Sequence, residues 1–477
     1  MNTESAVLRD IDELPGPRGL PVVGNLLQIE LSRMHLDIER WTRKYGAFFR
    51  FEIGGLKFLV VADHEVVGGV LRDRPEGFRR TVRLQNVANE MALAPGLFGA
   101  EGVAWRHQRR MVMAGFDPAH IRDYFPALVK VTQRLHGRWR KAARAGTAID
   151  LQPDLMRFTV DAIAGLAFGA DVNTLESDED VIQRHLDKIF PALFKRTMSQ
   201  VPYWRYVRLP SDRQLDRSVA SVNRAIDGFI AQARERMRID PSLREHPRNL
   251  LEAMIAAADL AGSGVSDREV AGNVMTMLLA GEDTTANSLA WMIYLLRRNP
   301  RTLQRAQDEV RRVAGDPAGY SLEQMGALQY VEACAHETMR LKPVAPLLVF
   351  EALRDTVIGD IRVPTDTIVW CVMRRDSVDE RHFPAPAAFE PQRWLGEGGP
   401  SQAANAAKRV SMPFGAGPRL CPGRNLALLE MKMAMAMLLG RFDIESVETP
   451  DGGEAEEHLS FTMAPVGLRM RLHERAA

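Results

Sequence analysis

One predicted helix constrains the fold of this 477-residue chain more than any other feature. It begins at Ser266-Asp-Arg-Glu269, a capping box in which the serine accepts from first-turn N–H groups and the glutamate reaches back. Its apolar pattern continues to Arg298 and stops at Asn299-Pro300, because the residue before a proline avoids helical geometry. About 33 helical residues span roughly 50 Å. A helix this long and this apolar must cross the core of the protein.

Polar residues interrupt the apolar pattern in the middle of this helix, at residues 280–285 (A-G-E-D-T-T). Burying two acids and two threonines is energetically costly. Gly281 lowers helix propensity, and the threonine hydroxyls compete for backbone carbonyls. A solvated stripe with a packing glycine is one interpretation of this segment. A functional site at the centre of the molecule is the other.

The remaining chain alternates between strand-like and helix-like patterns. Apolar alternation over residues 47–62, with Gly54-Gly55 in the middle, predicts a hairpin, and strand character returns over 345–373. Residues 106–310 are mostly helix-like, and 396–407 are expected to form a surface loop. With no internal repeat and no long linker, we expect a mainly α chain with small β-sheets (α+β). It would form one domain over residues 1–477, β-rich at about 45–65, 345–375 and the C-terminal region, and helical at about 100–340 and 420–440.

Composition excludes several classes of function. The chain has 62 Lys and Arg against 61 Asp and Glu, so non-specific nucleic-acid binding is not expected. Its three cysteines form no C-x-x-C pair, which argues against a disulfide scaffold or a cysteine-rich zinc site. The longest uncharged run, residues 284–296, is shorter than the roughly 18 residues that a membrane span needs. The N-terminus resembles no signal peptide, so we expect a soluble cytoplasmic protein without a membrane anchor.

A single cysteine lies in a glycine- and proline-rich segment, residues 412–423 (M-P-F-G-A-G-P-R-L-C-P-G). A helical pattern begins directly afterwards at Arg424, so Cys421 lies at a helix N-terminus, where N–H groups stabilise a thiolate. Such a thiolate can act as a nucleophile or a metal ligand. A nucleophile usually needs a histidine base, and the neighbouring sequence has none. A buried structural cysteine in a turn is the third interpretation.

Residues 414–423 resemble F-x-x-G-x-R-x-C-x-G, the haem-binding signature of the cytochrome P-450 family. The resemblance covers nearly the whole chain, from the proline-rich segment 14–21 to Arg471. It implies the cytochrome P-450 fold, with haem b (iron protoporphyrin IX) buried between the long central helix and the cysteine loop. Four further motifs are similar to those of the family: Trp105-Arg-His-Gln-Arg109, the helix centre 280–285, Glu337-Thr-Met-Arg340, and residues 389–394.

The resemblance also implies roles for single residues. Cys421 would be the axial haem ligand, and Asp283 and Thr284 would relay protons during oxygen activation, whereas Glu282 is expected to face away from the haem. Arg374 stands where many relatives carry histidine, which puts one propionate contact in doubt. The other implied cofactor-binding residues are Phe414, Trp105, Arg109, Arg419 and Gly281. The substrate pocket would include Phe98, Ala280, Ala345, Leu347 and Met463, with core packing as the alternative for each. Glu337, Arg340 and Arg393 would form a buried structural ion network.

Together these features predict a bacterial-type haem-thiolate monooxygenase acting on a hydrophobic small molecule such as a fatty acid, terpenoid or other secondary metabolite. Because no fused reductase is expected, a ferredoxin or flavodoxin with its NAD(P)H-dependent reductase would supply electrons. The same fold with non-hydroxylating chemistry, and a non-catalytic haem-thiolate sensor, stay as alternatives. The expected docking surface for the electron donor comprises Arg106, Arg110, Lys408, Arg409, Arg424 and Lys432, with a solvated set of helix charges as the alternative.

Overall fold

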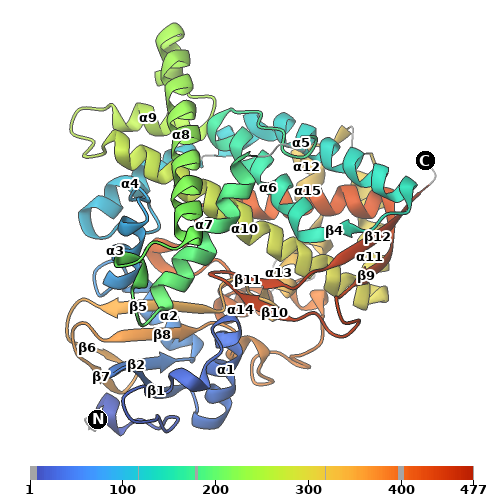
Figure 1. The fold of residues 1–477 in the computed structure, drawn as a ribbon. Coiled ribbons are helices and arrows are strands. Elements are labelled where there is room, and N and C mark those ends of the chain that lie inside the picture. The colour runs from blue at the N-terminus through green and yellow to red at the C-terminus, as the bar shows by residue number, and fades with distance from the viewer. Residues whose placement is uncertain (1–7, 117, 178–180, 317–318, 396–401, 476–477) are drawn as a thin grey trace.

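The computed structural model describes residues 8–116, 118–177, 181–316, 319–395 and 402–475. A sheet region lies beside the N-terminus, and helices make up most of the remaining body (Figure 1). The helices are α1 (Met34–Tyr45), α2 (His64–Arg72), α3 (Val82–Glu90), α4 (Gly102–Gly115), α5 (Pro118–Ala145), α6 (Leu151–Phe168), α7 (Val181–Met198), α8 (Pro210–Ile239), α9 (Leu250–Ala258), α10 (Asp267–Arg298), α11 (Pro300–Ala314), α12 (Leu322–Ala327), α13 (Gln329–Leu341), α14 (Gln402–Ser411) and α15 (Arg424–Arg441).

The strands lie mainly in one five-stranded sheet of order β1-β2-β8-β5-β3 and in a three-stranded sheet of order β4-β12-β9. The pairs β6–β7 and β10–β11 form two small hairpins. The strands are β1 (Phe48–Ile53), β2 (Leu56–Val61), β3 (Phe78–Arg79), β4 (Ile149–Asp150), β5 (Leu347–Ala352), β6 (Thr356–Ile358), β7 (Ile361–Val363), β8 (Ile368–Val372), β9 (Phe442–Glu448), β10 (Glu457–Leu459), β11 (Met463–Pro465) and β12 (Arg469–Glu474).

The predicted hairpin and the second strand region meet in the five-stranded sheet. In the hairpin, Phe48 pairs with Val61 in antiparallel register. Gly54 and Gly55 form its turn with φ angles of 58° and 79°, values that glycine adopts without strain. Strand β2 then runs parallel to β8, and β8 runs antiparallel to β5. The predicted mixed α+β class, with small sheets, is confirmed.

Helix α10 is the predicted core-crossing helix, and it runs without interruption for 32 residues. Its capping box is formed as expected, with Ser266 Oγ accepting from the Glu269 N–H and the Glu269 carboxylate accepting from the Ser266 N–H. Helix α10 packs along α6, and a Cβ added at Gly281 would lie 3.2 Å from Ile163 Cγ1 of α6. Glycine therefore lets the two helices approach closely at the centre of the molecule.

One predicted loop is wrong in part. Residues 402–407 were expected in a surface loop, but they form the first part of helix α14, whereas 396–401 lie outside the described residues. Alanine is the strongest helix former, so the alanine-rich sequence of this segment favours a helix once one face can be buried. Ala407 and Val410 supply that face by packing with Phe383 and Trp394.

Among the described helices, none is both long and apolar enough to span a lipid bilayer.

Candidate active site

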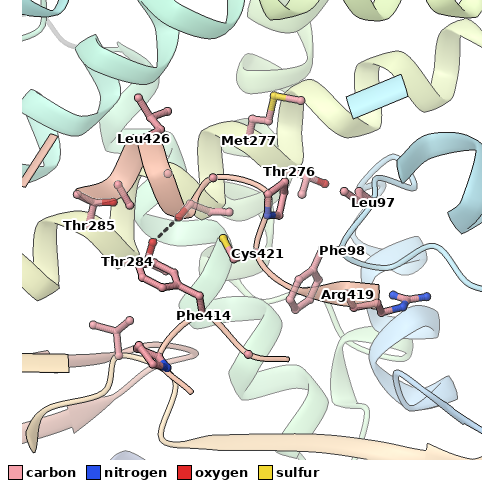
Figure 2. A pocket seen from close by; sticks show the side chains of 18 of the residues that line it. Leu97, Phe98, Thr276, Met277, Thr284, Thr285, Phe414, Arg419, Cys421 and Leu426 are labelled. Atoms are coloured by element: carbon pink, nitrogen blue, oxygen red, sulfur yellow. Dashed lines mark hydrogen bonds between the residues drawn. The ribbon is translucent and has the colours of Figure 1, made fainter. Parts of the chain in front are cut away.

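The segment before α15 folds into a tight loop that presents Cys421 to a cavity. Backbone turning is supplied by Gly415 and Gly417, with φ angles of 76° and 70°. Gly417 has a second constraint, because a Cβ there would lie 2.7 Å from both Arg72 Cα and Leu71 O at the end of α2. The Cys421 N–H donates to Phe414 O at 3.0 Å, which closes the loop around the thiol. Figure 2 shows the sulfur directed into the cavity, close to Phe414.

Two opposing effects act on the pKa of the Cys421 thiol. Burial raises the pKa of the Cys421 thiol above its ordinary value. The backbone N–H groups of Gly423 and Arg424 and the guanidinium of Arg109 act in the opposite direction. Cys334 and Cys371 are fully buried, and burial raises the pKa of both thiols. Of the three cysteines, Cys421 is therefore the one suited to bind a metal.

The opposite wall of the cavity is the centre of α10. The cavity has a volume of about 360 Å³, and Ala280, Gly281 and Thr284 line it together with the Cys421 loop. The Thr284 hydroxyl donates to Ala280 O at 2.7 Å within the helix, and Figure 2 shows it on the same cavity as Cys421. The structure thus brings the predicted thiolate and the predicted relay alcohol to the same cavity.

Asp283 lies next to Thr284 but points elsewhere. The described residues that line the cavity include Thr284 and not Asp283. The Asp283 carboxylate accepts hydrogen bonds from the Thr462 hydroxyl, in the turn between β10 and β11, and from Asn287 Nδ2 at 2.7 Å. Burial raises the pKa of Asp283 more than these two donors lower it. These two partners thus hold the carboxyl outside the described lining of the cavity. Glu282 is buried and is also absent from the described lining.

Buried and half-buried arginines gather along part of the cavity wall. The predicted residues Arg109, Arg419 and Trp105 all line it, with the Arg419 guanidinium 4.8 Å from the centre of the Trp105 ring. Arg109 Nη2 donates to Leu420 O at 2.8 Å, and Arg419 pairs with Glu101. The structure adds two arginines that the sequence analysis missed, Arg74 and Arg80.

Arg74 and Arg80 are short of anionic partners. Arg74 Nη2 lies 3.6 Å from Glu101 Oε1, while its Nε and Nη2, like the Nε of Arg80, have no hydrogen-bond partner among the described residues. Burial and neighbouring guanidinium groups lower the pKa of Arg74 to about 8 and that of Arg80 to about 10. Both also stack on aromatic rings, Arg74 on Phe350 at 4.2 Å and Arg80 on Phe98 at 4.0 Å. This end of the cavity is therefore suited to bind an anion.

The predicted substrate-pocket residues divide into two groups. Phe98 and Ala280 line the cavity, and the Phe98 ring also lies 5.8 Å from that of Phe461. Ala345, Leu347 and Met463 lie outside the described lining, whereas their neighbours Val344, Leu348 and Phe350 belong to it. Leu347 is absent from the lining because side chains alternate between the two faces of strand β5, and Leu348 and Phe350 lie on the cavity side. Met463 is fully buried and binds Val344 O through its backbone N–H.

Comparison with known proteins decides the family. The family model for cytochrome P450 matches residues 14–471, which is nearly the whole chain. The chain belongs to the cytochrome P450 family. It is therefore a monooxygenase-type oxidoreductase, and the family and fold imply a haem cofactor.

Several curated P450 relatives share about a quarter of the sequence. The chain is 28% identical to cytochrome P450 97B2 of Glycine max, a protein named as chloroplastic, over 91% of this chain and 82% of that protein. It is 27% identical to a self-sufficient cytochrome P450 monooxygenase of Aspergillus niger over 97% of this chain, but it spans only 43% of that fungal protein. Among solved structures, the heme domain of cytochrome P450DA superposes with a TM-score of 0.83 at 25% identity, covering 98% of this chain and 99% of that one.

The residues present fit a P450 haem. Four arginines line one part of the cavity: Arg74, Arg80, Arg109 and Arg419. In the described contacts, Glu101 is the one acid close to them, so their positive charge is not balanced. The two propionates of a haem would supply the missing negative charge. Guanidinium groups match carboxylates in shape and charge. At the other side, Cys421 offers the sulfur that a haem-thiolate protein needs. The orphaned Nε atoms of the arginines are the observation that supports this fit.

The P450 E-x-x-R residues form the predicted network away from the cavity. Both Glu337 and Arg340 are fully buried, with Arg340 Nε and Nη2 each 2.8 Å from the Glu337 carboxylate. Arg393 Nε donates to the same carboxylate at 3.0 Å, and Trp394 Nε1 donates at 2.8 Å. Arg374, which was in doubt as a propionate ligand, instead forms ion pairs with Glu39 and Glu457. It is thus occupied in a second buried network.

Proposed function

We propose that this P450 uses haem b and dioxygen to insert one oxygen atom into a C–H or C=C bond of a hydrophobic small molecule. The observation that carries the proposal is one cavity with Cys421 on one wall and Thr284 on the other. Apolar side chains make up much of the remaining wall, including Leu97, Phe98, Ile163, Met277, Val344 and Leu348. An apolar cavity with a few polar groups is typical of a site for a small hydrophobic ligand. We also propose that residues 1–477 act as one haem-thiolate domain.

The chain's own residues would divide the work of the reaction. When bound, the haem would supply the activation of dioxygen, and the Cys421 thiolate would hold its iron and donate electron density to it. The arginines at the cavity end would orient the cofactor, and the apolar wall would hold the substrate and exclude bulk water. Thr284 would hold a proton donor at its hydroxyl, and Asp283 would deliver protons from the edge of the site.

Turnover with labelled dioxygen tests this function directly. Substrates are first selected from a compound library by spectral shifts on binding and then incubated with ¹⁸O₂, NAD(P)H and a ferredoxin–reductase pair. A product carrying one ¹⁸O atom supports the monooxygenase. A product without the label indicates desaturation or coupling, and binding without any electron-dependent product indicates a sensor.

The Thr284–Asp283 pair makes a first prediction. Thr284→Ala should leave substrate binding nearly unchanged while more of the reducing equivalents appear as hydrogen peroxide. Asp283→Asn should lower kcat by roughly 10²-fold, the low end for general acid–base groups, because it removes a proton carrier. Product, peroxide and NAD(P)H consumption are measured together. Thr284→Ser is the matched control that keeps the hydroxyl, and unchanged coupling in Thr284→Ala would show that this hydroxyl is not the relay group.

Phe98 makes a second prediction, about selectivity. Its ring lies on the cavity wall between Arg80 and Phe461. Phe98→Ala should enlarge the cavity and shift the site of oxidation on a long substrate, as measured by the product distribution. Phe98→Leu, which keeps most of the volume, is the control. If the distribution stays the same and the melting temperature falls sharply, Phe98 serves the packing of the core instead.

We propose that electrons arrive from a separate acidic ferredoxin or flavodoxin, which docks on basic side chains around the cysteine loop. Arg110, Lys408, Arg409 and Arg424 of the expected set are exposed. Two members are less suited than expected. Lys432 is buried and pairs with Glu332 at 2.9 Å, and Arg106 is exposed but pairs with Glu76 at 2.6 Å.

Electrostatic steering makes a third prediction. Because attraction between exposed charges is screened beyond a Debye length of about 8 Å at physiological ionic strength, the first electron transfer should slow as salt rises. Arg424→Glu or Arg110→Glu should slow it further in stopped-flow reduction and leave substrate affinity unchanged. Arg213→Glu, an exposed arginine on α8, is the matched control. A reduction rate that is indifferent to salt and to both reversals would refute this docking surface.

A further inference from the structure

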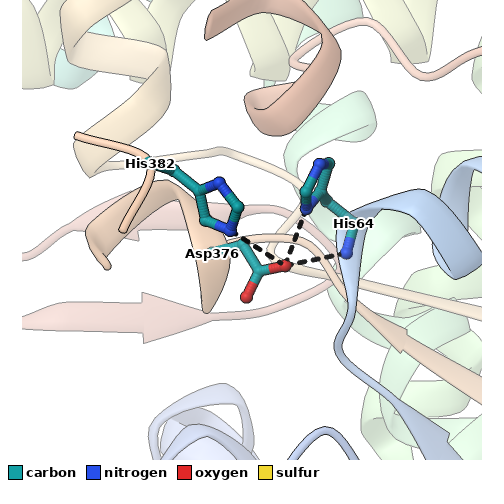
Figure 3. A group of neighbouring side chains, drawn as sticks. All are labelled: His64, Asp376 and His382. Atoms are coloured by element: carbon teal, nitrogen blue, oxygen red, sulfur yellow. Dashed lines mark hydrogen bonds and ion pairs between the residues drawn. The ribbon is translucent and has the colours of Figure 1, made fainter. Parts of the chain in front are cut away.

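Two histidines and an aspartate converge at a place that the proposed function does not use. His64 is the first residue of α2, Asp376 begins the short helix η7 (Asp376–Val378), and His382 lies in the turn that follows. One potential ligand atom from each lies within 4.8 Å of the other two. Figure 3 shows both imidazole rings directed at the same carboxylate. Of the described residues that line the Cys421 cavity, none belongs to this cluster.

The distances suit a single metal ion. His64 Nδ1 lies 2.9 Å from Asp376 Oδ2, and His382 Nε2 lies 4.0 Å from the same oxygen. The two rings are nearly perpendicular, with centres 4.7 Å apart and an interplanar angle of 75°. Zinc binds histidine nitrogen and carboxylate oxygen at about 2.0–2.2 Å in tetrahedral geometry, so two ligands of one ion lie roughly 3.3–3.6 Å apart. An ion between the three atoms therefore needs only small side-chain movements.

The exposure of the three side chains gives an ion a route of entry. Asp376 is buried at the base, with 3% of its side chain exposed, whereas His64 and His382 are 16% and 27% exposed. The rings thus form a rim around a buried carboxylate. Three protein ligands leave a further coordination position for water on the solvent side, as in other three-ligand sites.

Neighbouring groups fix the carboxylate and set the local charge. Asp376 Oδ1 accepts from Arg375 Nη1 at 2.7 Å, and Oδ2 also accepts from the backbone N–H of His64 at 2.9 Å. Such outer contacts orient metal ligands in known sites. Asp379 acts electrostatically on both Arg375 and Arg381, and Asp63 acts on Arg381. Three carboxylates against two guanidinium groups leave the neighbourhood with a net negative charge, which favours a cation.

We propose that His64, Asp376 and His382 bind one divalent transition-metal ion of the zinc class, separate from the haem. Imidazole nitrogens with one carboxylate suit Zn²⁺ better than Mg²⁺ or Ca²⁺, which prefer oxygen ligands throughout. The ion joins two segments that support the haem side of the molecule. Helix α2 ends against Gly417 of the cysteine loop, and the segment after Asp376 provides Ser377 O to Arg340. Metal binding therefore stabilises the fold around the cysteine loop.

The test measures zinc binding and stability and needs no turnover. Haem-loaded protein is treated with a chelator, dialysed, and titrated with ZnCl₂ by isothermal calorimetry, with bound zinc counted by elemental analysis. We expect one zinc per chain and a rise in melting temperature on zinc addition. His64→Gln and His382→Gln should each weaken binding by more than about tenfold, since even outer-shell changes cost that much, and should remove the temperature rise. His246→Gln, an exposed histidine before α9, is the matched control.

Several outcomes would overturn the proposal. These are no saturable binding by the wild type, or zinc binding that persists unchanged in both histidine variants. A purely structural hydrogen bond between His64 and Asp376 predicts a lower melting temperature in His64→Gln without zinc and no zinc-dependent rise in the wild type. Soret absorbance and circular dichroism confirm that each variant is folded. Should His64→Gln fail to fold, His382→Gln carries the test alone, because His382 Nε2 lies 4.0 Å from the carboxylate, beyond hydrogen-bond distance.

Discussion

Replacing Cys421 by histidine should abolish the red-shifted Soret band that reduced P450 proteins show with carbon monoxide, and monooxygenase turnover with it. The band requires a thiolate ligand, because sulfur donates more electron density than an imidazole. The structure offers Cys421 as the cysteine on the cavity, held by the hydrogen bond from its own N–H to Phe414 O. A difference spectrum of the reduced protein with and without carbon monoxide measures the effect.

The other two cysteines provide the matched control for this experiment. Cys334 and Cys371 are fully buried in packed regions, and neither belongs to the described lining of the cavity. Cys371→Ala should keep the band and lower the melting temperature modestly, since it removes one buried sulfur atom. A wild-type spectrum of the globin kind, or a band that survives in Cys421→His, would contradict the assignment of Cys421 as ligand.

The parts of the fold that sequence predicts well have local signals. Both ends of helix α10 have a signal in the sequence: a capping box at Ser266 marks its start, and Asn299-Pro300 marks its end. The β1–β2 hairpin carries its turn as Gly54-Gly55. Helix α14 was missed because its alanines were grouped with the preceding glycines, although alanine and glycine have opposite helix propensities. Where a short segment of sequence determines a helix or a turn, the prediction succeeds if each residue of that segment is considered separately.

The parts of the site that sequence does not predict depend on tertiary contacts. Arg74 and Arg80 lie in a charged segment after α2, where exposed arginines are the usual expectation. In the structure Arg74 is buried and Arg80 is half-buried, and both guanidinium groups pack on the ring of Phe350 in β5, a contact that no local sequence pattern predicts. The orientation of the Asp283 side chain also depends on a tertiary contact, because its partner Thr462 is 179 residues away in the chain.

Strand β5 shows a different limit. Its first four residues, Leu347 to Phe350, are all apolar, so the period-two pattern that would identify the cavity face is absent. The structure places Leu348 and Phe350 on the cavity, one position away from the predicted Leu347. An error of one residue in the phase of a strand moves every side chain to the opposite face. A substrate-pocket prediction in such a strand therefore needs the structure.

Removing the Glu337 carboxylate should destabilise the protein strongly. Glu337 and Arg340 are both fully buried, and Arg393 and Trp394 donate to the same carboxylate. Glu337→Leu leaves the guanidinium of Arg340 buried without its counter-ion, and breaking a buried pair in this way costs about 3–5 kcal/mol. Urea unfolding followed by circular dichroism gives the free energy of unfolding, and Soret absorbance reports haem retention in the same samples.

An exposed ion pair on a helix provides the comparison that isolates burial as the cause. Glu235 pairs with Arg238 on α8 at 2.7 Å, with 54% and 73% of the two side chains exposed. Exposed pairs contribute about 0–1 kcal/mol, so Glu235→Leu should change stability little. The double variant Glu337→Leu with Arg340→Leu should recover part of the loss, because it removes the uncompensated charge together with its partner. If Glu337→Leu is no more harmful than Glu235→Leu, the buried network does not support the fold in the way argued. If the double variant is as unstable as the single one, then the contacts of Arg340 with the backbone carbonyls of Ser377, Pro386 and Ala388 dominate over its ion pair.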